Sequence, residues 1–335
     1  MTKFTVLVTC GAGYIGSHAV LALLDAGYQV VVIDNLESGF RWAVDPRATF
    51  IQGDVEDELL VSDALAQQEI KAIMHFAGSV VVPESVRDPL KYYRNNTAAS
   101  RTLIECAVRG EVRHFIFSST AATYGVPDES PVSETTSTRP INPYGRSKLM
   151  TEQMLRDVAE AHPINYCALR YFNVAGADPQ GRSGQSTAGA THLIKVAVEA
   201  ATGQRAHVSV YGTDFPTRDG TGVRDYIHVS DLAAAHVHAL QALVAKPERN
   251  LILNCGYGRG SSVIEVLDAV DRLSELKPER KLEGRRSGDP PELIADNAAI
   301  LEELPWRPAR DDLDVIVADA LAWERKLLER GTARG

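Results

Sequence analysis

The chain has 335 residues, of which 44% are hydrophobic and 24% charged, and its formal net charge is −9 at pH 7. This composition is typical of a globular protein with one large domain or two closely joined lobes. The acidic balance argues against nucleic acid or an anionic membrane surface as a partner. No apolar run approaches the roughly 20 residues of a spanning helix, and no signal peptide is apparent, so we expect a cytoplasmic protein.

The four cysteines, Cys10, Cys106, Cys167 and Cys255, lie far apart in the sequence and form no CxxC pair. Closely spaced cysteines would be needed for a zinc site, and a disulfide framework is typical of small secreted domains. We therefore expect reduced thiols and no bound metal.

In the first half of the chain, short apolar runs alternate with segments of helical periodicity. The runs 4–9, 29–33, 72–77, 114–119 and 166–171 predict buried strands, and the segments 15–26, 59–67, 89–108 and 144–161 predict the helices between them. This order is typical of an α/β fold with a doubly wound (Rossmann-type) parallel sheet. Ligands of such sheets bind at the carboxyl ends of the strands.

The pattern changes after about residue 170. Gly and polar residues predict a loop over 176–189, a helix is expected over 191–202, and 226–243 returns to a strand followed by a helix. We therefore predict a Rossmann-type domain over 1–172 with a returning segment at 225–243. A smaller, interleaved substrate lobe is expected over 173–224 and 244–335.

A glycine-rich turn joins the first strand to the first helix. Gly11, Gly13 and Gly16 let the backbone turn tightly and approach a pyrophosphate, whose charge the helix N-terminus stabilises. Asp34 ends the second strand, at about the 20-residue separation where an acid bonds the adenosine ribose hydroxyls. An acid there repels a 2′-phosphate, so the pattern favours NAD over NADP. The alternative for Asp34 is a structural residue at the strand end.

Asp54 follows Gly53 just before the second helix. Its carboxylate suits the amino group of adenine, and a helix cap is the alternative interpretation.

Tyr144 and Lys148 are four residues apart on a predicted helix, so both side chains lie on one face. Pro143 suits the first helical position and Asn142 the cap before it. A free phenol has a pKa near 10, about three units too high for a base at neutral pH. A nearby lysine cation and an oxidised nicotinamide would both lower it. The pair is therefore suited to accept a proton from a sugar hydroxyl while hydride leaves the same carbon.

Thr120 follows the fourth predicted strand, at the sheet edge where this architecture places its chemistry. Its hydroxyl can bond the reacting sugar oxygen and shorten the proton path to Tyr144. The alternative is a threonine that only satisfies the backbone of a turn.

With these residues, the chain resembles the UDP-galactose 4-epimerases of the extended short-chain dehydrogenase/reductase superfamily. The motifs that carry the resemblance are GAGYIG at 11–16, Asp34-Asn35, Gly53-Asp54, Phe76-Ala77-Gly78, YGRSK at 144–148, RYFN at 170–173, GTGVRDY at 220–226 and RRSGD at 285–289. They are distributed over nearly the whole chain.

The resemblance implies a tightly bound NAD, a UDP-sugar substrate and a homodimer. The expected catalytic residues are Tyr144, Lys148 and Thr120. The expected NAD contacts are Gly11, Gly13, Tyr14, Ile15, Gly16, Asp34, Asn35, Asp54, Val55, Phe76, Ala77, Gly78, Asn95, Tyr144, Lys148 and Tyr171. The expected substrate contacts are Thr120, Tyr144, Asn173, His192, Leu193, Tyr211, Arg224, Arg286, Asp289 and Leu293. The arginines suit a diphosphate, because their charge is permanent and their donors form a fork.

The implied reaction is reversible C4 epimerisation of UDP-glucose and UDP-galactose. Tyr144 accepts the 4′-hydroxyl proton as hydride passes to NAD, the 4-keto sugar turns over, and both return on the other face. Ala121 and Ala122, directly after Thr120, argue against a 4,6-dehydratase, which needs an acidic pair there. A 4-epimerase of UDP-pentoses, UDP-uronates or UDP-N-acetylhexosamines and a non-catalytic NAD-binding protein remain the alternatives.

Four positions depart from better-known members or leave the substrate open. Cys10 stands where the first glycine of the turn is expected, Val80 where many members have lysine, and His192 where many have asparagine. A side chain at position 10 is costly if the backbone there has positive φ. Leu293 matches the position that limits room at the C2 substituent of the sugar, and its intermediate bulk leaves N-acetylated sugars open.

Overall fold

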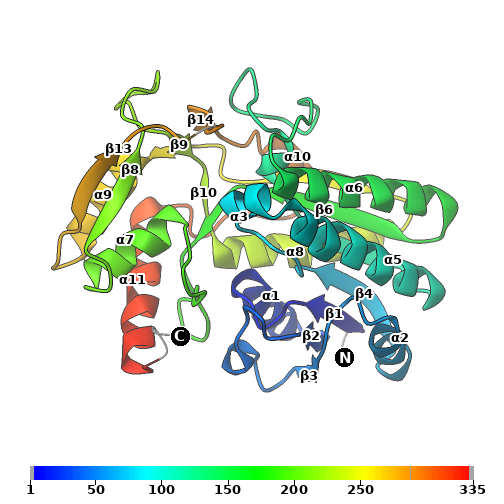
Figure 1. Ribbon diagram of the computed structural model, residues 1–335. Helices are drawn as coiled ribbons and strands as arrows, with labels where there is room; N and C mark the ends of the chain where they lie inside the picture. Colours follow the sequence, from blue (N-terminus) through cyan, green and yellow to red (C-terminus); the bar gives the residue numbers. More distant parts are fainter. Residues whose placement is uncertain (1–3, 287, 332–335) are drawn as a thin grey trace.

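A computed structural model of the protein describes residues 4–286 and 288–331, so Ser287 of the RRSGD motif lies outside the described residues. Its centre is a seven-stranded parallel sheet, which confirms the predicted doubly wound α/β fold (Figure 1). Across the sheet, the strands are β11 (Leu251–Cys255), β6 (Asn165–Tyr171), β5 (His114–Thr120), β4 (Ile70–His75), β1 (Thr5–Thr9), β2 (Gln29–Asp34) and β3 (Thr49–Gln52).

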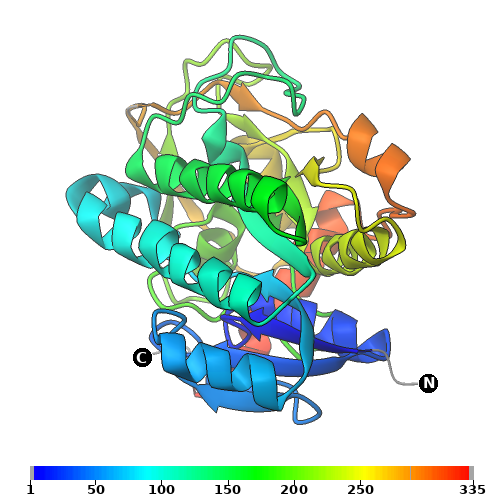
Figure 2. The same cartoon turned by 90° about the vertical axis from the view of Figure 1, so that its right-hand side faces the viewer.

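Alternate residues of each strand point to opposite faces, and each face buries its own apolar core. On β1, Val6 and Val8 pack with α1 (Tyr14–Asp25) and α8 (Val229–Ala245), whereas Leu7 faces the other side. That other side is covered by α2 (Glu58–Gln67), α5 (Ala99–Arg109) and α6 (Pro143–Ala161). Helices α5 and α6 run side by side on the outer face (Figure 2).

Two features of the main sheet differ from the sequence prediction. Strand β11 pairs with β6, although 244–335 was assigned to the substrate lobe. The expected single helix over 89–108 is instead α4 (Pro89–Tyr92), a π-helical turn (Tyr93–Ala98) and then α5. π turns are rare and occur mostly as single turns inside α-helices, so a helical pattern over a whole segment does not by itself indicate one.

A smaller lobe lies beside the sheet (Figure 1). Its helices are α7 (Leu193–Ala201), α9 (Val263–Leu273) and α11 (Leu313–Glu329), and they enclose a separate apolar core. Its short strands pair as β8 (His207–Tyr211) with β13 (Glu279–Glu283), β7 (Asn173–Ala175) with β10 (Tyr226–His228), and β9 (Val223–Arg224) with both β12 (Ser261–Ser262) and β14 (Glu292–Leu293). The remaining short helices are α3 (Val82–Arg87), α10 (Ala298–Glu303) and the 3₁₀ turns at Arg41–Ala43 and Ala121–Thr123.

Candidate active site

The glycine-rich turn leaves β1 and enters α1 at the carboxyl edge of the sheet. A Cβ on Gly16 would overlap the Cys10 carbonyl oxygen, and one on Gly11 would lie 2.7 Å from Val32. Gly13 is the cap residue of α1 and has no side chain to fill its N-terminus. The first N–H groups of α1 can therefore receive a phosphate.

Cys10 has a positive φ of 55°, so this departure from glycine places a side chain in the left-handed region. Burial, and then the neighbouring Asp34 carboxylate, raise the pKa of the Cys10 thiol to about 12. The thiol is therefore protonated at neutral pH. The Lys148 cation acts on the pKa of this thiol in the opposite direction and lowers it.

Asp34 is buried and holds the turn. Its carboxylate accepts hydrogen bonds from the backbone N–H of Ala12 (2.9 Å) and of Leu36 (2.8 Å). The amide of Asn35 donates to Asp54 Oδ2 at 2.9 Å, which joins the segments that follow the neighbouring strands β2 and β3. The structure thus places the four expected dinucleotide elements along one edge: the turn, Asp34, Asn35 and Asp54.

The proposed catalytic helix α6 begins as its sequence predicts. The side chain of Asn142 accepts a hydrogen bond from Gly145 N at 2.8 Å, and Pro143 occupies the first turn. Tyr144 and Lys148 are both buried on the face of α6 that meets the sheet. Lys148 Nζ donates to the Ser118 carbonyl at 3.0 Å and lies 5.0 Å from the centre of the Phe117 ring.

Thr120 ends β5, two residues after the Ser118 carbonyl that accepts from Lys148. Burial raises the pKa of the Tyr144 phenol, and the hydrogen bond with the Thr120 hydroxyl opposes that effect. Thr120 Oγ1 also accepts a hydrogen bond from Ala122 N at 3.1 Å, which is the role of a threonine that satisfies the backbone of a turn. Burial lowers the pKa of Lys148 to about 8.

A network that the sequence analysis did not identify supports Lys148. Gly78 has a φ of 148°, and a Cβ there would lie 3.7 Å from Lys148 Nζ. The buried Asn96 side chain fixes the next residue, because its Oδ1 accepts from Ser79 N (2.7 Å) and its Nδ2 donates to Ser79 O (3.0 Å) and to Ser147 Oγ (3.0 Å). Asn96 lies in the π-helical turn, and such turns are frequent at functional sites.

The Phe76-Ala77-Gly78 motif is held by β1. The Thr9 hydroxyl accepts from Phe76 N and Ala77 N, each at 3.1 Å, and contacts His75 Nδ1 at 2.8 Å. Tyr171 hydrogen-bonds Ser118, the residue whose carbonyl receives Lys148. Asn95 donates to Ser79 Oγ at 3.0 Å.

The expected substrate residues fall into two groups in the lobe. Leu293 pairs with Arg224 across β14 and β9, and the Arg224 guanidinium lies 3.8 Å from Asp289. The Arg286 guanidinium stacks 3.7 Å from the centre of the Tyr211 ring. A diphosphate and a nucleoside could both be held by such paired arginines and a planar ring.

Leu293 connects these groups to the catalytic side chains. It packs against a buried cluster that includes Ala121, directly after Thr120, and Phe172, directly before Asn173. At the other boundary, His192 caps α7, and the Gln185 side chain lies 3.1 Å from its Nδ1. Leu193 is the first residue of α7.

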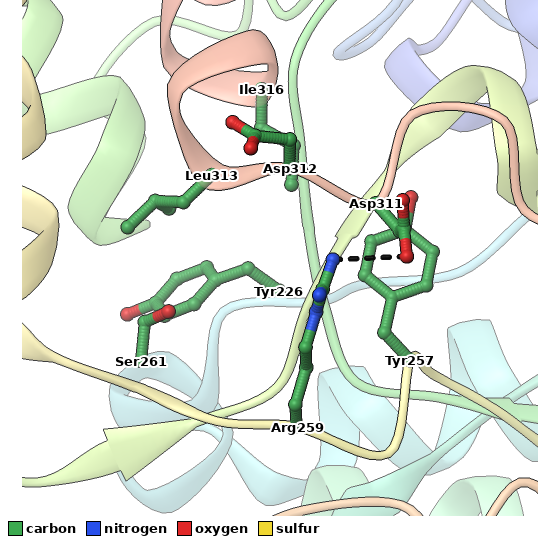
Figure 3. Close-up of a pocket in the computed structure, with 8 residues that line it drawn as sticks. All are labelled: Tyr226, Tyr257, Arg259, Ser261, Asp311, Asp312, Leu313 and Ile316. Atoms are coloured by element: carbon green, nitrogen blue, oxygen red, sulfur yellow. Dashed lines mark ion pairs between the residues drawn. The ribbon is translucent and has the colours of Figure 1, made fainter.

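Away from these residues, a hollow of about 220 Å³ opens between β10, the segment after β11 and the start of α11 (Figure 3). An ion pair of 3.0 Å between Arg259 and Asp311 crosses it. It shares no lining residue with the expected site. Among residues 4–286 and 288–331 there is no group of three potential metal ligands and no helix long and apolar enough to span a membrane.

Comparisons with known proteins agree with this geometry. The model of the NAD dependent epimerase/dehydratase family matches residues 6–256. The chain is 53% identical to a UDP-glucose 4-epimerase of Azospirillum brasilense, over 96% of this chain and 92% of that protein. Among solved structures, it is similar to UDP-glucose 4-epimerase from Brucella ovis in complex with NAD (43% identity, TM-score 0.93, 96% and 98% of the two chains).

A second solved structure is that of UDP-glucose 4-epimerase from Bifidobacterium longum in complex with NAD⁺ and UDP. Its TM-score is 0.91 at 38% identity, and the match covers 98% of this chain and 99% of that one. With a family match over most of the chain and full-length relatives, the chain belongs to the NAD-dependent epimerase/dehydratase family.

Proposed function

We propose that the protein interconverts UDP-glucose and UDP-galactose by inverting the configuration at C4 of the sugar. The observation that carries this proposal is the burial of Tyr144 and Lys148 on α6, with Lys148 bonded to the Ser118 carbonyl near the end of β5, at the edge of the sheet that carries the glycine-rich turn. The relatives described above are named for this activity.

The chain supplies proton transfer and orientation. In this proposal a sugar hydroxyl bonds to both Thr120 and Tyr144, and Tyr144 accepts the proton as the carbon is oxidised. Lys148, held by the Ser118 carbonyl, provides the cation that favours the phenolate. NAD, when bound, supplies the oxidation by taking hydride from C4 and returning it. Epimerisation then requires that the sugar turn while Arg224 and Arg286 keep the nucleotide in place.

Water elimination is disfavoured by what surrounds Thr120. The following residues, Ala121 and Ala122, carry no acid, and the buried Glu152 beside this strand is paired with Arg170 at 2.6 Å. Both oxygens of this carboxylate bond Arg170, and one of them also accepts from Ser119. Hydride return without loss of water is therefore the outcome that this site supports.

The experiment is to incubate the purified holoenzyme with UDP-galactose and to follow UDP-glucose by proton NMR. We expect an equilibrium mixture of both sugars to form from either starting compound. Turnover of UDP-xylose or UDP-glucuronate without turnover of UDP-galactose would move the proposal to another UDP-sugar. Absence of turnover on all of them by NAD-loaded protein would contradict it.

The substrate range depends on Leu293, which packs against Ala121 and Phe172. UDP-N-acetylglucosamine belongs in the same panel, together with a Leu293→Gly variant. We propose that truncation at this position increases kcat/KM for the N-acetylated sugar relative to UDP-glucose, because it adds room beside the sugar. An unchanged ratio would show that Leu293 does not limit the C2 substituent.

A homodimer is a further part of the proposal. Helices α5 and α6 lie side by side (Figure 2). The side chain of Met150, on α6, is 40% exposed. Light scattering coupled to gel filtration tests this point, and a mass near 36.4 kDa at micromolar concentration would contradict it.

A further inference from the structure

One face of α1 bonds directly to the segment that leads to the substrate residues. Tyr14 and Ser17 are three residues apart and lie on the same side of α1. The Tyr14 hydroxyl donates to the Gly176 carbonyl at 2.7 Å, and the hydroxyl oxygens of Ser17 and Ser183 are 2.6 Å apart. Both serines are only 1% exposed, so water does not compete for this bond. These contacts join the cofactor turn to the segment 176–192.

The first part of this segment is held in one shape by its own bonds. The Asp178 carboxylate accepts from the backbone of Gln180 and Arg182 and pairs with the Arg182 guanidinium at 2.8 Å. Arg182 also pairs at 2.9 Å with Asp25, the last residue of α1. The segment therefore follows α1 as one piece.

Helix α11 holds the opposite side. Lys326 Nζ donates to the Gly181 carbonyl at 2.6 Å, and the Trp323 indole N–H donates to Ser186 Oγ at 3.2 Å. A Cβ on Gly184 would overlap the Trp323 ring, so the backbone lies directly against it. A packed segment of this kind shifts between discrete positions rather than yielding gradually.

Both ends of the segment carry expected substrate contacts. Asn173, on β7, lies three residues before Gly176. At the other end of the segment, His192 is the N-cap of α7 and Leu193 is its first residue. Gln185, two residues after Ser183, contacts His192. A shift of the segment relative to α1 would thus displace groups on both sides of the sugar.

We infer that Tyr14 and Ser17 are positioning residues that couple NAD binding to UDP-sugar binding. In this scheme, bound NAD fixes the position of the glycine-rich turn and α1. The hydroxyls of Tyr14 and Ser17 transmit that position to the segment 176–192. The segment in turn determines where the substrate residues lie. Coupling between two binding affinities is reciprocal, so a bound nucleotide must raise the affinity for NAD by the same factor that NAD raises the affinity for the nucleotide. We expect this higher affinity to show as a slower loss of NAD. The inference rests on the proposed function only in that UDP is taken as the anchoring part of the substrate.

The test measures this coupling in the holoenzyme. Released NAD is converted to fluorescent NADH by added alcohol dehydrogenase and ethanol, with and without saturating UDP. In the wild type, we expect UDP to slow NAD loss by about tenfold or more. In Ser17→Ala and in Tyr14→Phe, that ratio should fall by about three- to tenfold, as expected for the loss of one buried hydrogen bond.

The matched control is Ser62→Ala. Its hydroxyl donates to the Cys106 thiol on the α2 side of the sheet, so the variant removes a serine hydroxyl without touching 176–192. The ratio in Ser62→Ala should equal that of the wild type. A role limited to stability would lower the melting temperature of Ser17→Ala and Tyr14→Phe and leave the ratio unchanged, which would overturn the inference.

A wild-type ratio near one would overturn it as well. Calorimetric titration of the holoenzyme with UDP is done first, because failure to bind UDP would count against the proposed function and not against the coupling. Turnover of UDP-galactose is measured on the same preparations. Turnover with a ratio of one leaves the proposed function standing and removes the coupling.

Discussion

At the scale of single residues, burial opposes the charges that Tyr144 and Lys148 need. Removing the phenol removes the proton acceptor, so Tyr144→Phe should lower kcat by about 10²- to 10⁴-fold. NAD should stay bound, because the turn and Asp34 are unchanged. Stopped-flow or endpoint assays of UDP-galactose turnover, with NAD content read by absorbance, check both statements.

The control for this variant is Tyr92→Phe. Tyr92 is also buried, its ring lies 6.4 Å from that of Tyr144, and its hydroxyl donates to the Val81 carbonyl rather than toward Thr120. Its kcat should stay within about tenfold of the wild type, even if stability falls by the roughly 1 kcal/mol of a lost hydrogen bond. Equal losses of kcat in the two variants would contradict a specific role of Tyr144.

Cys10 is a second residue to test, because the cost of its backbone strain and the contribution of its thiol can be measured separately. A side chain at a φ of 55° costs roughly 1–2 kcal/mol, and glycine removes that cost. Cys10→Gly should therefore retain NAD longer and unfold at a higher temperature. The measurements are thermal unfolding and the rate of NAD loss on gel filtration.

Cys10→Ala distinguishes strain from the thiol, because it keeps the Cβ and removes only the sulfur. It should behave like the wild type if strain is the cause. Faster NAD loss in Cys10→Gly than in the wild type would show that the thiol supports the turn.

These residues also show what single-sequence reasoning could reach. The position of Thr120 at the end of β5, two residues after the Ser118 carbonyl that receives Lys148, follows from the motifs and from strand order. Asn96 was missed, since no spacing rule indicates a buried amide that fixes Ser79 from a π-helical turn. The sole signal was a pair of adjacent asparagines before a helical stretch, which is also typical of a solvent-exposed turn.

At the scale of elements, α6 is fixed to the sheet by a buried ion pair. The Arg170 guanidinium on β6 binds both oxygens of Glu152, at 3.0 and 2.6 Å, and Ser119 donates to the same carboxylate. Glu152 lies one turn beyond Lys148 on α6, so the Glu152–Arg170 ion pair fixes the position of this helix relative to the sheet. Glu152→Ala leaves a buried cation and should cost about 3–5 kcal/mol of stability.

The double variant Glu152→Met/Arg170→Met should recover most of that loss, because it removes both charges and keeps the volume. Urea unfolding measures the free energy of unfolding of the single and double variants, and the two values are compared. A double variant no more stable than Glu152→Ala would show that packing, and not the unpaired charge, determines the loss. This pair was not predicted, because Glu152 and Arg170 belong to different elements and only the fold brings them together.

The full set of strands in the central sheet was also not predicted from the sequence. The alternation of strands and helices predicted the central strands, whose apolar runs are continuous. Strand β11 was missed: the run Leu251–Cys255 lies about 80 residues beyond β6, its partner, so no local signal connects them. Long-range pairing of this kind is set by the packed sheet edge and not by the residues of the strand alone.

At the scale of the whole molecule, three buried histidines are held neutral. Burial lowers the pKa of His75 to about 3 and those of His18 and His236 to about 4. The unfolded chain takes up these protons below about pH 6.5 and the folded chain does not, so stability should fall as pH drops from 6.5 toward 4. Asp225 and Glu134 act in the opposite sense, since burial raises the pKa of Asp225 to about 6 and also raises that of Glu134. Burial lowers the pKa values of His114 and His192 as well, which adds to the effect of the three histidines.

Part of the loss of stability at low pH can be assigned to His236. His236 Nδ1 lies 2.8 Å from the Leu232 carbonyl and is its donor, a bond that an asparagine amide can replace. His236→Asn should therefore flatten the loss of stability between pH 6.5 and 4 by up to about 1.4 kcal/mol per pH unit, the contribution of one proton. Urea unfolding at pH 7, 6 and 5 measures this slope, with the exposed His207→Asn as the control. Equal slopes in His236→Asn and the wild type would mean that His236 takes up its proton in the folded protein, and that the packing of its ring against Phe76 and Tyr171 opens in acid.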